Sequence, residues 1–173
     1  MERRKFIQAA GGAAAAAIAA PAMSADLPTL NWRLASSFPK SIDTLYGGVE
    51  FFAKRVGELT GGKFTIRTFP AGELVPGLQV LDAVQNGTVE MGHTALYFYF
   101  GKDPAFTFHT CGPFGLSSRQ QMAWYDAGGG REIYQEFLKG YGIVDFPAGN
   151  TGGQMGGWFR KEIKSVEDLS GLK

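Results

Sequence analysis

The residues most suited to ligand chemistry lie near the carboxyl end, where Gln154 stands among four glycines and precedes Trp158 and Arg160. An amide, an indole and a guanidinium are groups that bind small polar molecules, and the glycines let another backbone pass closely. A second group is the aromatic run from Tyr97 to Phe100, whose rings and phenolic hydroxyls can line a small pocket. Both groups look like parts of a binding site.

The sequence gives little support for an enzymatic activity. The sequence lacks a Gly-x-Ser-x-Gly elbow, a Walker loop and a His-Glu-x-x-His helix. His93 and His109 lie sixteen residues apart without a pair of carboxylates, so each is better explained as a core or loop histidine than as a metal ligand. A secreted hydrolase on an α/β scaffold stays a weaker alternative, which an absence of turnover with ester or amide substrates would set aside.

The composition limits the size of the fold and the class of partner. With 173 residues, 45% of them hydrophobic, the chain can bury one ordinary core, which predicts one domain or one and part of another. A net charge of +1 gives no reason to propose nucleic acid or an anionic membrane surface as a partner. Cys111 is the only cysteine, which excludes a disulfide framework, and we expect it to be a small buried residue.

The amino terminus predicts an export signal over residues 1–25. Arg3 and Arg4 precede a weakly apolar, alanine-rich run that is too short to be a permanent membrane anchor. The arginine pair resembles a twin-arginine signal, which implies the twin-arginine export machinery as a partner. An alanine-rich amphipathic helix is the weaker alternative, because the run has no polar face. We expect cleavage near Ala25 and a mature protein in the periplasm of a Gram-negative cell.

After the signal, strand and helix patterns alternate. Alternating apolar residues predict strands over 30–35, 63–69 and 89–96, and spacings of three and four predict helices over 41–59 and 76–87. The inward residues are expected to be Leu45, Val49, Phe52, Val56 and Leu59 in the first helix, and Leu78, Leu81 and Val84 in the second. This βαβαβ order predicts an α/β fold with a mainly parallel sheet and helices on its faces.

Ligands of such sheets bind outside the carboxyl ends of the strands, so three loops matter most. They span residues 36–41, 69–77 and 96–103. The side chains in them that could serve a ligand are Phe38, Lys40, Glu73, the aromatic run 97–100 and Asp103. We expect two of the four aromatic residues to face the core, and turn chemistry explains Asp103 before Pro104 as well as ligand binding does.

The last third of the sequence changes character. Two short helices are predicted over 117–126 and 131–139, separated by three glycines, and a further strand over 142–149. The glycine-rich stretch that follows is interpreted as a strand crossing between two lobes, and residues 165–171 as a helical turn. We therefore assign a first lobe to residues 26–148, and the crossing strand with the start of a second lobe to residues 149–173.

Three segments together carry a family resemblance: RLASSFPKS, FPAGELVPGLQVLDAVQNGTVEMGHTALYFYFGKDP and GNTGGQMGGWFRKEI. In this order after a twin-arginine leader, they resemble the DctP-type solute-binding proteins of tripartite ATP-independent periplasmic (TRAP) transporters. The resemblance runs from about residue 30 to the end, and is closest to the branch that binds 2-oxo and 2-hydroxy acids with a metal cation. It implies a type II-like periplasmic binding protein of two α/β lobes, the first mostly present here and the second truncated.

The resemblance also implies roles for residues of the crossing segment. Gln154 corresponds to a glutamine whose side-chain oxygen ligates the cation or the substrate, against the alternative of an exposed strand glutamine. Arg160 suits an anionic ligand, although a solvated or interlobe salt-bridge role explains it equally well. Trp158 either closes on the apolar side of the ligand or packs between the lobes, with packing slightly favoured. An arginine that pairs with the substrate carboxylate is expected just beyond Lys173.

For the first lobe, the resemblance implies an aromatic wall. A tyrosine of the run 97–100 reaches the ligand, so Tyr97, Tyr99 and Phe100 are candidate contacts, and Phe38 after the first strand is another.

The implied function is capture of a small 2-oxo or 2-hydroxy acid, such as pyruvate, together with a sodium or calcium ion. The lobes close on the acid, and the protein then docks on the TRAP membrane permease subunits. A homodimer is also implied, since some members of the branch are dimers. A solute-binding protein of an ATP-driven importer is the alternative. For the chain as given, we expect weak or no affinity and a partly exposed apolar cleft face.

Overall fold

The computed structural model describes residues 28–110 and 112–172, so the predicted signal and Cys111 lie outside the described residues. Within these two ranges, no helix is both long enough and apolar enough to span a bilayer.

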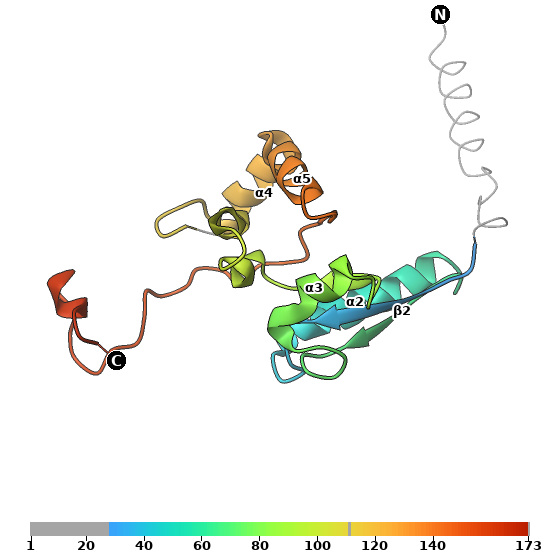
Figure 1. Ribbon diagram of the computed structural model, residues 1–173, viewed down its shortest axis with the longest axis horizontal. Coiled ribbons are helices and arrows are strands. Elements are labelled where there is room, and N and C mark those ends of the chain that lie inside the picture. Colours follow the sequence, from blue (N-terminus) through green and yellow to red (C-terminus); the bar gives the residue numbers. More distant parts are fainter. Residues whose placement is uncertain (1–27, 111, 173) are drawn as a thin grey trace, which may run out of the picture.

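The sheet consists of three parallel strands, β1 (Leu30–Ser36), β2 (Phe64–Phe69) and β3 (Met91–His93), in the order β2-β1-β3. Two helices connect them, α2 (Asp43–Leu59) between β1 and β2, and α3 (Val80–Gln85) between β2 and β3 (Figure 1). The predicted α/β fold with a parallel sheet is therefore confirmed. The third strand is shorter than predicted, because residues beyond His93 turn away from the ladder into the short helix η3 (Leu96–Tyr99).

The two helices cover opposite faces of the sheet. Leu34 of β1 lies in one buried cluster with Val49 of α2, while its neighbour Ala35 lies in another with Val80 of α3. This follows from strand geometry, because successive side chains point to opposite faces. Each face of β1 is thereby removed from water, and the carboxyl ends of the strands are held at one edge.

The buried stripe of α2 differs from the prediction. Phe52 and Leu59 were expected to face inward, but they are 44% and 70% exposed. Val49 and Val56 pack on the sheet as predicted, Ala53 packs there as well, and Tyr46 is the other buried residue of the helix. A helix turns by about 100° per residue, so the row that contains Phe52 and Leu59 lies beside the buried stripe rather than in it.

Leu78 is a second correction, because it was predicted to face inward and is 64% exposed. The predicted single helix is split, with a 3₁₀ turn, η2 (Gly77–Gln79), ahead of α3. A 3₁₀ turn has three residues per turn, so its side chains do not continue the face of the α-helix. Leu81, within α3, is buried as predicted.

A second core lies beyond β3, under the short helices η3 and η4 (Pro104–His109) and the helices α4 (Ser118–Ala127) and α5 (Gly130–Lys139). Phe106 and Leu138 are fully buried there, with Tyr99 and Leu81 beside them. The helices α4 and α5 confirm the predicted pair. Ser117 and Gln120 form a capping box at the start of α4, and Gly129 supplies the positive φ of 85° that separates the two helices.

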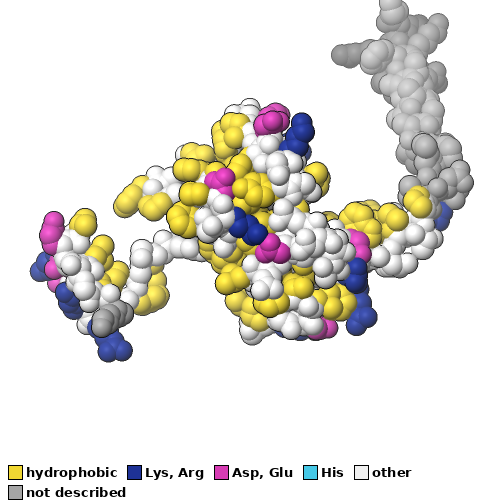
Figure 2. Space-filling view, in the orientation of Figure 1, with side chains coloured by type: hydrophobic (Ala, Val, Ile, Leu, Met, Phe, Trp, Pro, Cys, Tyr) yellow, Lys and Arg dark blue, Asp and Glu magenta, His cyan; other side chains and the backbone are white. Residues whose placement is uncertain are grey.

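The final segment, residues 144–172, contains a single described helical turn, η5 (Glu167–Leu169). The strand predicted over 142–149 is wrong. A strand needs a neighbouring strand to hydrogen-bond with, but here a side chain bonds to the backbone carbonyl of the segment. Gln135 donates to the carbonyl of Asp145 at 3.0 Å. Figures 1 and 2 show the rest of the segment projecting away from the sheet, with apolar and charged side chains on its surface. The glycine-rich stretch forms no strand either, and its role as the link between lobes stays a prediction.

Candidate functional site

The three loops predicted to matter meet at the carboxyl edge of the sheet. The Ser37 hydroxyl, after β1, lies 2.6 Å from the Gly77 carbonyl, after β2, and 2.6 Å from the Thr94 hydroxyl, after β3. The Ser37 N–H also donates to the His93 carbonyl at 2.7 Å. All three loops are therefore joined by direct hydrogen bonds at one point.

Gly77 makes this junction possible. A Cβ built on Gly77 would lie 2.8 Å from the Ser37 carbonyl oxygen, closer than real Cβ contacts come. The first and second loops can thus approach only because residue 77 has no side chain. Sequence reasoning identified both loops but passed over Gly77, Ser37 and Thr94. The signal was present, since Ser37 and Thr94 each directly follow a strand and Gly77 is a glycine that ends the second loop.

The Tyr99 hydroxyl is connected to the same junction through Thr94. It lies 3.0 Å from the Thr94 hydroxyl and accepts the Leu81 backbone N–H at 3.0 Å. The Tyr99 side chain is only 3% exposed, and its ring packs edge-on against Phe106. Of the candidate contacts, Tyr99 is therefore the one that belongs to the core.

The other aromatic candidates have mixed exposure. Tyr97 is 43% and Phe100 is 58% exposed, whereas Phe98 packs against the second core, so two of the four residues face inward as predicted. The Phe38 ring lies 6.0 Å from the Phe98 ring, and Tyr97 stacks edge-on against Phe98 at 4.7 Å. The structure thus brings both Phe38 and Tyr97 against the ring of Phe98.

His93 ends β3 beside Phe38, with 5.2 Å between the ring centroids. Its Nδ1 lies 3.0 Å from the hydroxyl of Ser36, which also accepts the Phe38 N–H at 3.1 Å. Burial lowers the pKa of His93 from its ordinary value, because the charged ring would be removed from water. A neutral imidazole that accepts from Ser36 satisfies this geometry, as expected of a loop histidine.

His109 also has structural partners. Its Nε2 hydrogen-bonds to the Asp145 carboxylate, whose other oxygen accepts from Gln135 at 2.7 Å, and its ring lies 4.2 Å from that of Tyr134. These bonds tie η4 and α5 to the point where the final segment begins. Both histidines are therefore satisfied loop residues, as the sequence indicated.

The remaining candidates lie on the projecting segment and are not brought to the aromatic wall. Trp158 is 89% exposed, and Arg160 is exposed as well. Gln154 is exposed and donates its side-chain Nε2 to the Thr151 hydroxyl at 2.7 Å. This bond orients the amide so that its oxygen stays available, the group that a hard cation binds.

The acidic and basic candidates of the loops have plainer explanations. The Asp103 carboxylate caps η4 by accepting the Ala105 N–H at 2.8 Å, which is the turn chemistry weighed for it. Lys40 and Glu73 are exposed. In the part of the chain that the structure describes, no three His, Cys, Asp or Glu side chains are grouped as a metal site.

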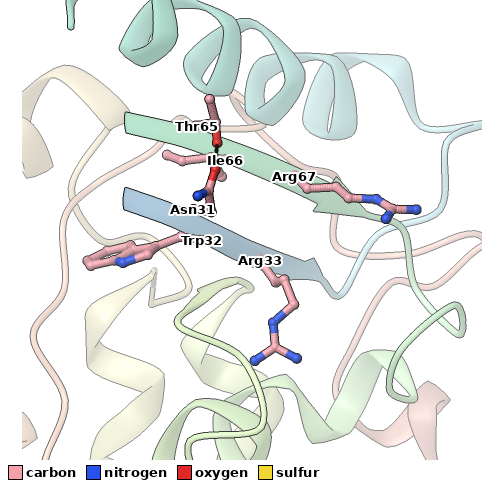
Figure 3. A pocket seen from close by; sticks show the side chains of 6 residues that line it. All are labelled: Asn31, Trp32, Arg33, Thr65, Ile66 and Arg67. Carbon is pink, nitrogen blue, oxygen red and sulfur yellow. Dashed lines mark hydrogen bonds between the residues drawn. The ribbon is translucent and has the colours of Figure 1, made fainter. Parts of the chain in front are cut away.

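A pocket of about 590 Å³ lies away from this edge, along the middle of β1 and β2 (Figure 3). It is lined by Asn31, Trp32, Arg33, Thr65, Ile66 and Arg67. Its polar groups have partners of their own: Arg33 forms an ion pair with Glu90 at 2.7 Å, and the Arg67 guanidinium lies over the Phe69 ring. No residue predicted for the ligand lines this pocket, and its position does not fit a site at the carboxyl ends of strands.

The sequence profile of DctP, the bacterial extracellular solute-binding proteins of family 7, matches residues 35–173. A curated relative, the monocarboxylate 2-oxoacid-binding periplasmic protein of Nostoc sp., is 58% identical over 151 residues, which cover 87% of this chain and 41% of the relative.

Two solved structures share this fold with a TM-score of 0.80. One is a TRAP transporter solute-binding protein from Bordetella bronchiseptica, 55% identical, covering 84% of this chain and 44% of that one. It is described as a mixed-occupancy dimer with copurified calcium and picolinate. The other, from Pseudoalteromonas atlantica, is 44% identical, covers 83% of this chain and 44% of that one, and holds sodium and pyruvate. The chain spans about two fifths of the length of these relatives.

Proposed function

The chain belongs to the bacterial extracellular solute-binding proteins of family 7, and we propose that it serves to capture a small 2-oxo or 2-hydroxy acid with a cation for a TRAP transporter. The relatives are named as periplasmic proteins, in agreement with the predicted location. The family is one of transport components, which fits the absence of catalytic motifs from the sequence.

One observation of the structure carries the proposal: three loops converge at the carboxyl edge of the sheet, with a partly exposed aromatic wall beside them. Phe38 and Tyr97, which both pack against the Phe98 ring, form this wall, and the exposed Phe100 follows in the same loop as Tyr97. A small monocarboxylate has a short apolar part and a charged end, so a flat aromatic surface suits one side of it and a phenolic hydroxyl can donate to the other.

The groups on the projecting segment complete the site when the protein closes. We assign the oxygen of Gln154 to the cation, Arg160 to the negative charge of the acid, and Trp158 to the apolar side that faces the wall. A sodium or calcium ion fits an amide oxygen, and when bound it offsets the charge of the carboxylate. Because only the closed form contacts the acid from both sides, ligand binding shifts the equilibrium toward closure.

The partners follow from the same proposal. The closed protein presents the acid to the membrane permease subunits of the transporter, and the twin-arginine machinery exports it. Homodimer formation is proposed by likeness to the Bordetella bronchiseptica protein, which is described as a dimer.

The proposal is tested by titration calorimetry on the full-length gene product, stripped of metal and reloaded with Ca²⁺ or Na⁺. Pyruvate should give a binding isotherm when the cation is present and a much weaker one when it is absent. Gln154→Ala should lower the affinity for the cation, whereas Arg119→Ala, a change of an exposed residue on α4, should leave both affinities unchanged. No heat with any monocarboxylate, with either cation, would refute the proposal.

A further inference from the structure

The hydroxyl groups at the loop junction form one chain of hydrogen bonds. A carbonyl oxygen only accepts, so the Ser37 hydroxyl donates to Gly77, and it shares this donor with the Thr94 hydroxyl, also at 2.6 Å. The Thr94 hydroxyl lies 3.0 Å from the Tyr99 hydroxyl, and either of these two can be the donor. The Tyr99 oxygen also accepts the Leu81 N–H.

Each of the three hydroxyl groups in this chain is therefore engaged in hydrogen bonds within the protein. The chain begins at the first turn of α3, where no side chain caps the helix start, and ends on the backbone of the second loop. It passes through all three loops at the ligand edge. Aligned hydrogen bonds polarise and strengthen one another, so the loss of one member weakens the rest.

The two tyrosines of the third loop consequently differ in what they can do. The Tyr99 hydroxyl is buried and bonds to both the Thr94 hydroxyl and the Leu81 N–H, while its ring is fixed in the core beside Phe106. The Tyr97 side chain is 43% exposed, and no group among the described residues hydrogen-bonds to its hydroxyl. A ligand at this edge can accept a proton from Tyr97 without breaking a bond of the fold.

We propose that Tyr99 is a positioning residue, which acts through Thr94 and Ser37 to fix the three loops at the carboxyl edge of the sheet. The acid-binding part of this inference rests on the proposed function. Gly77 supports it independently, since a Cβ built on it would lie 2.8 Å from the Ser37 carbonyl oxygen, so the loops are packed closely at the same point.

The test uses the full-length gene product and the variants Tyr99→Phe, Thr94→Val and the double variant. Each single change removes one hydroxyl and keeps the shape of the side chain. Each should weaken pyruvate binding in the presence of Ca²⁺ by about tenfold, the loss that corresponds to one buried hydrogen bond. Because both act through one chain, the double variant should bind no more weakly than the worse single variant.

Two matched variants separate positioning from a loss of stability. Thr94→Ser keeps the hydroxyl and should restore binding to within about twofold of wild type. Tyr134→Phe removes another buried phenol, which bonds to the Phe108 carbonyl far from the loops in the sequence, and should lower the unfolding temperature but leave affinity unchanged. Amide exchange at Leu81 in the ligand-free protein should accelerate in Tyr99→Phe.

The opposite results overturn the proposal in distinct ways. If Tyr99→Phe weakens binding but Thr94→Val does not, Tyr99 contacts the ligand directly. Unchanged affinity in both variants, or losses that simply add in the double variant, also contradict a shared positioning chain. If the wild-type protein binds no acid, the proposed function fails. Amide exchange at Leu81 then still decides whether the hydroxyl chain stabilises the loops.

Discussion

Residues 30–110 and residues 144–172 differ in the sequence separation of the residues that their hydrogen bonds join. In the first region, bonds join residues far apart in the sequence: Arg33 pairs with Glu90, and Ser37 bonds to Gly77 and Thr94. In the second region, Asp145 is tied to His109 and Gln135, but the hydrogen bonds that the structure shows from residue 146 onward are local, for example from the N–H groups of Lys164 and Ser165 to the Asp168 carboxylate. The comparison teaches that the first region fixes Phe38 and Tyr97 by contacts of its own, whereas Gln154, Trp158 and Arg160 are exposed and are not fixed by contacts with that region.

The largest effect is expected from the core under the wall. Phe106 is fully buried and contacts Tyr99, Phe137 and Tyr141 through ring packing. Phe106→Ala should lower the free energy of unfolding by about 3–5 kcal/mol, because it removes apolar contacts and leaves a cavity. Denaturant unfolding of both proteins measures this loss. A change below about 1 kcal/mol would mean that the first region is not held by this core.

A smaller loss is expected at the loop junction. Gly77→Ala places a methyl group against the Ser37 carbonyl, and the backbone rather than a flexible side chain has to yield. The free energy of unfolding should fall by about 1–3 kcal/mol, the usual cost of overpacking. Gly48→Ala is the matched control, because a Cβ there meets no atom within 4 Å and the site is helical. Equal stability of the two variants would show that the loops are not in tight contact.

The pH dependence of stability should report the long-range ion pair. The Glu90 carboxylate accepts from the Arg33 N–H, Nε and Nη2, and this pairing lowers the pKa of Glu90 to about 2. A carboxyl whose folded pKa is lowered adds stability above its ordinary pKa, and this is lost as pH falls toward the folded value. The unfolding temperature should therefore drop between about pH 4.5 and pH 2, and less steeply in Glu90→Gln. Parallel pH curves for the two proteins would contradict this linkage.

The smallest effect is expected in the projecting segment. Trp158 is 89% exposed, so Trp158→Ala should change the free energy of unfolding of the 173-residue chain by no more than about 0.5 kcal/mol. The same change should weaken acid binding by the full-length protein, if Trp158 closes on the ligand as proposed. Denaturant unfolding and titration calorimetry check the two parts. A large loss of stability in the chain alone would show that the two regions do not differ as described.

Local patterns in the sequence were sufficient for the order of the sheet strands, of the helices that connect them and of the pair α4 and α5, but not for η3 and η4 or for the final segment. Alternation in residues 30–35 and 63–69 predicted β1 and β2, and the glycines at 128–130 predicted the break between α4 and α5. These features depend on neighbours in the sequence, so a single sequence reveals them. The placement of the ligand loops at one edge also followed, because parallel strands bring their carboxyl ends together.

The sequence by itself determined the parallel α/β arrangement, the set of ligand loops and the family resemblance, since periodicity and motif order are written along the chain. Only the tertiary structure decided that Phe52 faces water, that Tyr99 is buried while Tyr97 is exposed, and that Ser37, Gly77 and Thr94 meet. These outcomes depend on contacts between residues tens of positions apart. No local pattern encodes such contacts, because which side of an aromatic run or helix is buried is settled by what packs against it.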